Sequence, residues 1–126
     1  MELGETMKTV KINFSLKVED GFPPIGVETL NAKALEDGTF ELLNAPFFVK
    51  ETAYGDIVSA TMSAESRLEF ADCVRASAYK AIAVILLGSN VRQRLMDVFD
   101  WKDCIVEYGE FAGYKTLAIA IPDIVD

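Results

Sequence analysis

The sequence predicts an α+β domain, in which a mostly antiparallel, curved sheet forms a partial barrel and one main helix packs on one face. Three observations predict it. Apolar and polar residues alternate over several short runs in the first half of the 126-residue chain, which is typical of half-buried strands. Turn-forming residues separate these runs. The second half contains one stretch of helical periodicity between further strand-like runs, and a two-layer arrangement would bury the apolar side of each.

The strand-rich part of the chain covers residues 8–76, and residues 1–7 before it are expected to be disordered. Alternation over 8–18 predicts the first strand, which ends before Pro23-Pro24 because proline lacks an amide donor. Asp37-Gly38 predicts a hairpin turn, since glycine tolerates a positive φ. The other strands predicted in this part are 27–34, 40–43, 57–62 and 67–76.

The stretch FELLNAPFFVKETAYGDIV, residues 40–58, places two phenylalanines between two turns. Asn44-Ala45-Pro46 ends the third strand, and Phe47 and Phe48 are expected to fill the core. Gly55-Asp56 predicts a second turn, with the aspartate bonding nearby amides. We interpret the stretch as structural, with no chemistry of its own.

Residues 79–122 predict the order strand, helix, strand, strand. YKAIAVILL, residues 79–87, is apolar enough to be a strand that is covered on both faces. Residues 90–102 form the helix, because Val91, Leu95, Val98 and Phe99 make one apolar stripe. Two strands follow at 104–111 and 115–121. The whole chain, 1–126, is expected to be a single domain.

Composition excludes several classes of function. The chain has no histidine, which removes Ser-His-Asp and Cys-His catalysis and most catalytic zinc sites. Its formal net charge is −8, so neither nucleic acid nor an anionic membrane is an expected partner. Cys73 and Cys104 lack metal-ligand spacing and are expected to be buried thiols. Without a signal-peptide pattern, we expect a cytoplasmic protein that needs no cofactor and no metal.

Several short motifs resemble those of an uncharacterised bacterial family, domain-of-unknown-function family 4265. They are Asn44-x-Pro46-Phe47, Gly55-Asp56-x-Val58 and the ending Ala118-Ile119-Ala120-Ile121-Pro122. The resemblance implies a fold more than an activity. It also implies a Gly-His-x-Thr element before the strand at residue 79. This chain has Ala76-Ser77-Ala78-Tyr79 there, so a polar site of the family at that position is not expected here.

The charges are segregated along the second half of the chain. Arg75, Lys80, Arg92 and Arg94 lie in a stretch without acidic residues. Five acidic residues then follow with one lysine, so the acids come at the end of the helix, where its dipole disfavours them. We interpret these acids and two neighbouring aromatics as a partner-binding acidic surface. Its predicted residues are Asp97, Asp100, Trp101, Asp103, Glu107, Tyr108 and Glu110.

The function that these features favour is that of a non-catalytic bacterial interaction protein. An immunity protein that neutralises a basic toxin, such as a nuclease, would use an acidic surface in this way. The alternatives are a small-molecule-binding or regulatory domain with Phe47 and Phe48 lining a cavity, and a histidine-free enzyme that relies on carboxylates such as Asp56 or Asp72. The sequence leaves the oligomeric state open.

Overall fold

The structure is a computed structural model that describes residues 8–87, 91–100 and 103–122. The expected disorder of residues 1–7 therefore lies outside the described residues. The elements are β1 (Thr9–Ser15), β2 (Val27–Ala34), β3 (Phe40–Leu42), β4 (Ile57–Met62), β5 (Leu68–Arg75), β6 (Tyr79–Ile85), α1 (Val91–Asp100), β7 (Ile105–Phe111) and β8 (Tyr114–Pro122). Each predicted strand, and the helix, is present at its predicted place.

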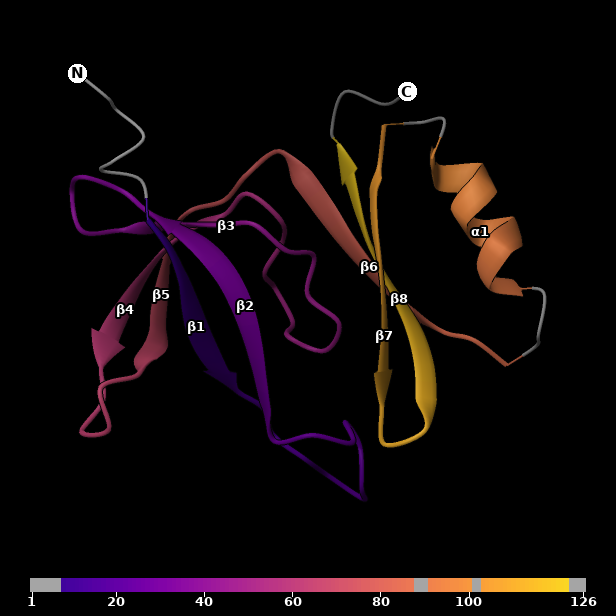
Figure 1. The fold of residues 1–126 in the computed structure, drawn as a ribbon, viewed down its shortest axis with the longest axis horizontal. Helices are drawn as coiled ribbons and strands as arrows, with labels where there is room; N and C mark the ends of the chain where they lie inside the picture. The colour runs from indigo at the N-terminus through magenta and orange to yellow at the C-terminus, as the bar shows by residue number, and fades with distance from the viewer. Residues whose placement is uncertain (1–7, 88–90, 101–102, 123–126) are drawn as a thin grey trace.

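The first five strands close into a barrel, seen on the left of Figure 1. Neighbouring strands from β1 to β5 pair antiparallel in chain order, and the hairpin turn at Gly38 has the expected positive φ of 89°. Closure comes from a short parallel pairing, in which Ile12 of β1 lies opposite Leu68 of β5 and Asn13 lies opposite Glu69. Because β1 and β5 pair there, neither strand has a free edge at these residues.

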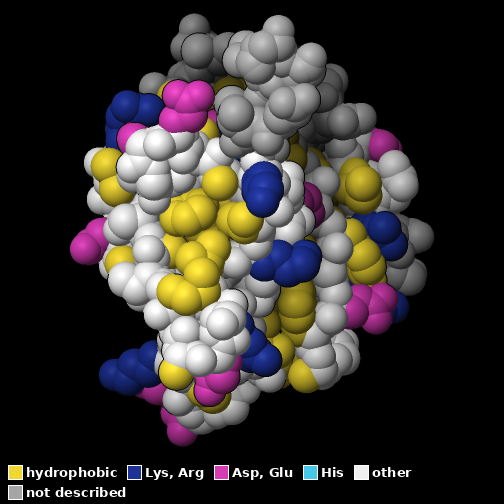
Figure 2. Space-filling model, turned by 60° about the vertical axis from the view of Figure 1, so that its left-hand side comes forward, with side chains coloured by type: hydrophobic (Ala, Val, Ile, Leu, Met, Phe, Trp, Pro, Cys, Tyr) yellow, Lys and Arg dark blue, Asp and Glu magenta, His cyan; other side chains and the backbone are white. Residues whose placement is uncertain are grey.

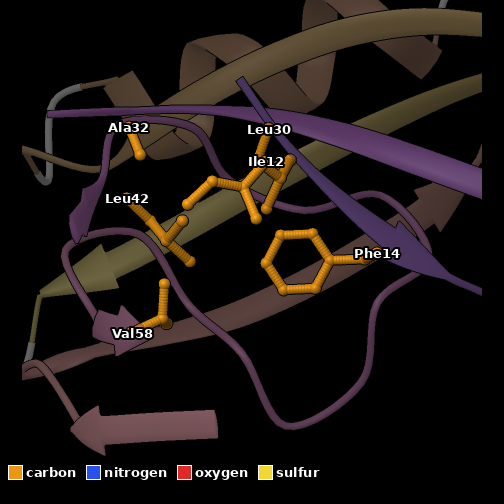
Figure 3. Packing of buried hydrophobic residues seen from close by; sticks show 6 residues of the cluster. All are labelled: Ile12, Phe14, Leu30, Ala32, Leu42 and Val58. Carbon is orange, nitrogen blue, oxygen red and sulfur yellow. The ribbon is translucent and has the colours of Figure 1, made fainter. Parts of the chain in front are cut away.

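Alternate residues of the barrel strands point inward and form the main core. Figure 3 shows six of these side chains converging from β1, β2, β3 and β4. They are Ile12, Phe14, Leu30, Ala32, Leu42 and Val58, each exposed by 3% or less. The Phe14 ring stacks on Phe70 of β5 at 4.7 Å between centroids. This packing explains why the alternation in the sequence was so regular.

The last three strands form a separate sheet in the order β6-β8-β7. Both outer strands pair antiparallel with β8, whose residues 116–120 are buried. Ala118 and Ala120 pack against Ala45 of the long β3–β4 connection, which lies between the barrel and this sheet (Figure 1). On the other face of this second sheet, Arg92 of α1 contacts Tyr108 of β7.

The structure corrects the predicted fold class. The chain is nearly all β, with a closed five-stranded barrel and a second sheet, and its α-helix has ten residues. The expected α+β fold, with a single curved sheet and a main helix packed on it, is therefore wrong. Alternation indicates that strands exist, but it does not say which strand ends meet, so one open sheet and two separate sheets looked alike in the sequence.

Two expectations about burial are also wrong. β6 is the exposed outer strand of its sheet, and β8 is the covered one. Cys73 is exposed, although it was expected to be buried.

Within the described residues, no helix has both the length and the apolar character that crossing a membrane requires.

Candidate functional site

The connection between β3 and β4 is held in place by buried carboxylates. Glu28 of β2 is 4% exposed and accepts three backbone hydrogen bonds. The donors are the amides of Phe47 at 2.6 Å, Phe48 at 2.8 Å and Val49 at 3.0 Å. A carboxylate in this position satisfies donors that no strand partner could reach, and charge makes each bond stronger. Glu28 thereby fixes the course of this segment.

A second carboxylate anchors the turn before β4. Asp56 is 4% exposed and accepts the amides of Ala53 at 3.0 Å and of Ser77 at 2.8 Å. Ser77 in turn donates its hydroxyl to the carbonyl of Tyr54 at 2.7 Å. Gly55 has φ 86°, and a Cβ there would lie 3.2 Å from the Ser77 side chain. This turn therefore joins the barrel to the segment just before β6. That segment is Ala76-Ser77-Ala78-Tyr79, which stands where the family resemblance implies a Gly-His-x-Thr element.

A third carboxylate comes from β7. Glu107 accepts the amide of Ala45 at 3.1 Å and the side-chain amide of Asn44 at 3.5 Å. Two residues on, Gly109 leaves room for aromatic rings, since a Cβ would lie 2.8 Å from Phe111 and 3.0 Å from Phe47. The β3–β4 connection thus donates hydrogen bonds to Glu28 of the barrel and to Glu107 of the second sheet.

Two hollows lie on either side of the segment 48–52, and both also include Phe22. The larger, of 920 Å³, lies between this segment and residues of β1 and β5 that include the core rings of Phe14 and Phe70. The smaller, of 470 Å³, lies between residues 46–52 and the five consecutive residues 81–85 of β6. Figure 2, which brings the barrel side forward, shows exposed hydrophobic side chains in groups beside charged ones. The smaller hollow has a mainly apolar lining, and concave apolar surface is where ligands and peptides bind.

The predicted acidic surface is divided by the structure. Asp97 on α1 and Asp103 just after it are both exposed. Glu110 is exposed at the far end of β7, where it accepts the Tyr108 hydroxyl at 2.7 Å. That hydrogen bond is the main reason why the pKa of Tyr108 is raised. Glu107 points the opposite way, toward the β3–β4 connection.

The separation of Glu110 from Asp97 and Asp103 follows from the length of β7. Five residue steps of β7 lead from Ile105 to Glu110, about 17 Å of extended chain. Asp103 lies two residues before Ile105, in a turn with φ 61°. The Arg92 guanidinium carbon lies 3.7 Å from the centre of the Tyr108 ring, so the Glu110 end also carries a cation. Asp97 comes three residues before the last residue of α1, and Asp103 comes three residues after it. The side chain of Asp100 and the whole of Trp101 lie outside the described residues.

The two carboxylates that the sequence offered for catalysis, Asp56 and Asp72, have different surroundings in the structure. Across 8–87, 91–100 and 103–122, no group of three His, Cys, Asp or Glu side chains could hold a metal ion. Asp56 is occupied by two backbone amides, and Asp72 is an exposed residue that lines the larger hollow beside Cys73. Cys73 is exposed, yet partial desolvation of its thiol raises the pKa, and the Asp56 charge adds to the effect.

Sequence reasoning missed Glu28 and Ser77. The signal for Glu28 was present, because alternation in β2 puts residue 28 on the same face as Leu30 and Ala32, which are core residues. A carboxylate on a core face needs hydrogen-bond donors, and unpaired amides in a nearby connection supply them. Ser77 gave no such signal, because its partners come from a turn that lies more than 20 residues away.

Comparison with known proteins gives a family and a fold. The sequence model of a family described as "Domain of unknown function (DUF4265)" matches residues 28–126. A solved structure, described as that of a hypothetical protein from Neisseria gonorrhoeae, superposes with a TM-score of 0.76 at 20% sequence identity. The alignment covers 93% of this chain and 78% of that one. No curated protein matches the chain.

Proposed function

Because the chain belongs to the DUF4265 family, whose description gives no activity, we propose its function from its surface chemistry: it is a non-catalytic interaction protein that binds a basic protein partner. The observation that supports this is the exposed pair Asp97 and Asp103 at the end of α1, on a chain with a net charge of −8. The resemblance noted from the sequence is confirmed by the family match, and it leaves the activity open.

The form of this function that we favour is that of an immunity protein, which neutralises a basic toxin in the cytoplasm of a bacterium. A toxin that cuts nucleic acid must attract phosphate, so its active surface is positive. An inhibitor with exposed carboxylates competes for that surface and associates fast, since opposite net charges steer the encounter.

The carboxylates in question are available to a partner. The two ion pairs that join described residues are Lys17–Glu19 and Lys33–Glu41, and both belong to the barrel half of the chain. Asp97 accepts one hydrogen bond, from the side-chain amide of Gln93 at 2.8 Å, which leaves its charge in place. The acidic surface of the proposal is therefore the end of α1 and the turn after it. Glu107 has no part in it.

The proposal predicts that a gene beside this chain's gene encodes a basic toxin domain, and the test uses that domain. Asp97→Lys combined with Asp103→Asn changes the charge by three units, and the double variant is compared with wild type for growth rescue and association rate. We expect association to slow about tenfold at low salt and the difference to shrink at high salt, because exposed charges are screened.

Glu36→Lys combined with Glu65→Gln is the matched control, since it changes the charge by the same amount at exposed barrel positions. The control is expected to rescue growth like wild type. Equal association rates for both double variants would show that the position of the charge is irrelevant and would remove the acidic surface from the proposal. Absence of any complex with wild type would refute the immunity function itself.

A further inference from the structure

The outer edge of β6 has no strand partner in the described part of the chain. β6 pairs with β8 on one side, and β8 pairs with β7 on its other side. All five residues from 81 to 85 line the smaller hollow. A hollow above one face of a strand would touch alternate residues only, because successive side chains point to opposite faces. The hollow therefore runs along the strand edge, as a groove.

The backbone of β6 offers hydrogen bonds to this groove. The amide of Leu86 donates to the carbonyl of Lys115 at 2.8 Å, so Leu86 and Lys115 form a hydrogen-bonded pair of the β6–β8 ladder. In an antiparallel ladder every second residue bonds to the same neighbour. The amides and carbonyls of Ala81, Ala83 and Ile85 consequently point away from β8, into the groove.

The opposite wall of the groove is apolar from Pro46 to Val49 and polar from Lys50 to Thr52, and its apolar part is fixed. It consists of residues 46–52, and the amides of Phe47, Phe48 and Val49 are already bound to Glu28. This wall can therefore contact an incoming segment through its side chains, whereas main-chain hydrogen bonds to that segment would come from β6. The alanines at 81 and 83 are short, so they leave space between the strand and the wall for the side chains of an incoming strand.

The charges around the groove are basic, in contrast to the rest of the protein. Lys80 stands at the start of β6, Lys115 lies beside its end, and Lys50 lines the groove together with a single carboxylate, Glu51. The chain as a whole, by contrast, has a net charge of −8. A second copy would bring its own lysines to the same edge and eight further negative charges, which disfavours pairing between copies.

We propose that this groove binds an extended segment of another protein, which adds to β6 as a further strand. The segment is apolar in its middle and carries carboxylates at both ends, where Lys80 and Lys115 lie. Main-chain bonds to β6 would hold it and the wall of residues 46–52 would select apolar side chains, as in other cases of strand addition. The inference is independent of the acidic surface on α1.

The experiment uses synthetic heptapeptides with the protein labelled with ¹⁵N. The first peptide is Glu-Val-Thr-Val-Thr-Val-Glu, the second has lysine in place of both glutamates, and the third is the first with alternate amides N-methylated. We expect the acidic peptide to slow amide hydrogen exchange at Ala81, Ala83 and Ile85. Exchange at Ile82 and Val84 should change little, because those amides already bond to β8.

Two variants test the protein side. Ala83→Pro removes an outward amide while sparing the bonds to β8, and proline is tolerated on edge strands, so binding should be lost from a folded protein. Lys80→Glu with Lys115→Glu should weaken the acidic peptide about tenfold. Lys11→Glu with Arg67→Glu, at exposed barrel positions, is the matched control and should bind as wild type does.

Several results would overturn the inference. Binding of the N-methylated peptide as strongly as its parent would show that no ladder forms, and this holds even if the proline variant does not fold. Equal binding of the acidic and lysine peptides would refute the charge preference. A concentration-dependent dimer in sedimentation that protects the same three amides would assign the groove to a second copy. No saturable binding of any peptide would refute the site.

Discussion

Replacing Glu28 by glutamine should destabilise the protein far more than an isosteric change on a strand normally does. The amide oxygen of glutamine can take the place of Oε1 and keep the bonds from Phe48 and Val49. Its NH₂ group then takes the place of Oε2 and faces the amide of Phe47. Both groups are donors, so the Phe47 amide loses its hydrogen bond. One unpaired buried amide costs about 1–2 kcal/mol, and two bonds that lose their charge cost about 0.5 kcal/mol each. The expected loss is about 2–3 kcal/mol.

Urea unfolding measures this loss, and amide exchange locates it. The amides of residues 47–49 should exchange faster in Glu28→Gln than in wild type, because they lose their acceptor. Glu41→Gln is the control: its carboxylate pairs with Lys33 at 3.5 Å, where both side chains are 36% exposed, so it should cost less than about 1 kcal/mol. A loss within about 0.5 kcal/mol of the control would contradict the role assigned to Glu28.

Two further changes probe the junction and the exposed thiol. Gly109→Ala should cost about 1–3 kcal/mol in the same unfolding assay, because the new methyl group overlaps the rings of Phe111 and Phe47; an unchanged midpoint would show that the rings move aside freely. Alkylation of Cys73 in a Cys104→Ser background should rise at a higher pH than that of a model thiol, since partial desolvation raises its pKa and disfavours the thiolate. Asp56→Asn should shift that profile to lower pH, and a profile like that of a model thiol would contradict the assignment.

The strands were predictable because alternation is a local property. Residues 27–34 match β2 to the residue, and the Asp37-Gly38 turn joins it to β3 as expected. The strand character of YKAIAVILL was also predictable from its β-branched residues. The order of strands in each sheet was not, because Ile12 meets Leu68 and Ala45 meets Ala118 only after the chain has closed on itself.

The candidate sites divide in the same way. Net charge and the acidic run from Asp97 to Glu110 are sequence properties, so Asp97 and Asp103 could be named in advance. Glu107 belongs to the same run, but strand alternation and the position of Ala45 turn it inward. Sequence separation along an acidic run therefore does not measure distance on a surface, because one residue along a strand reverses the side-chain direction.

Neighbouring residues along the chain determine where this protein forms strands and where it turns, and its composition determines how much charge it carries. Only the assembled fold shows that five strands close into a barrel, that Glu28 lies under a distant connection and that β6 pairs on one side alone among the described residues. These depend on which surfaces meet, and such contacts are set by the packing of the whole chain.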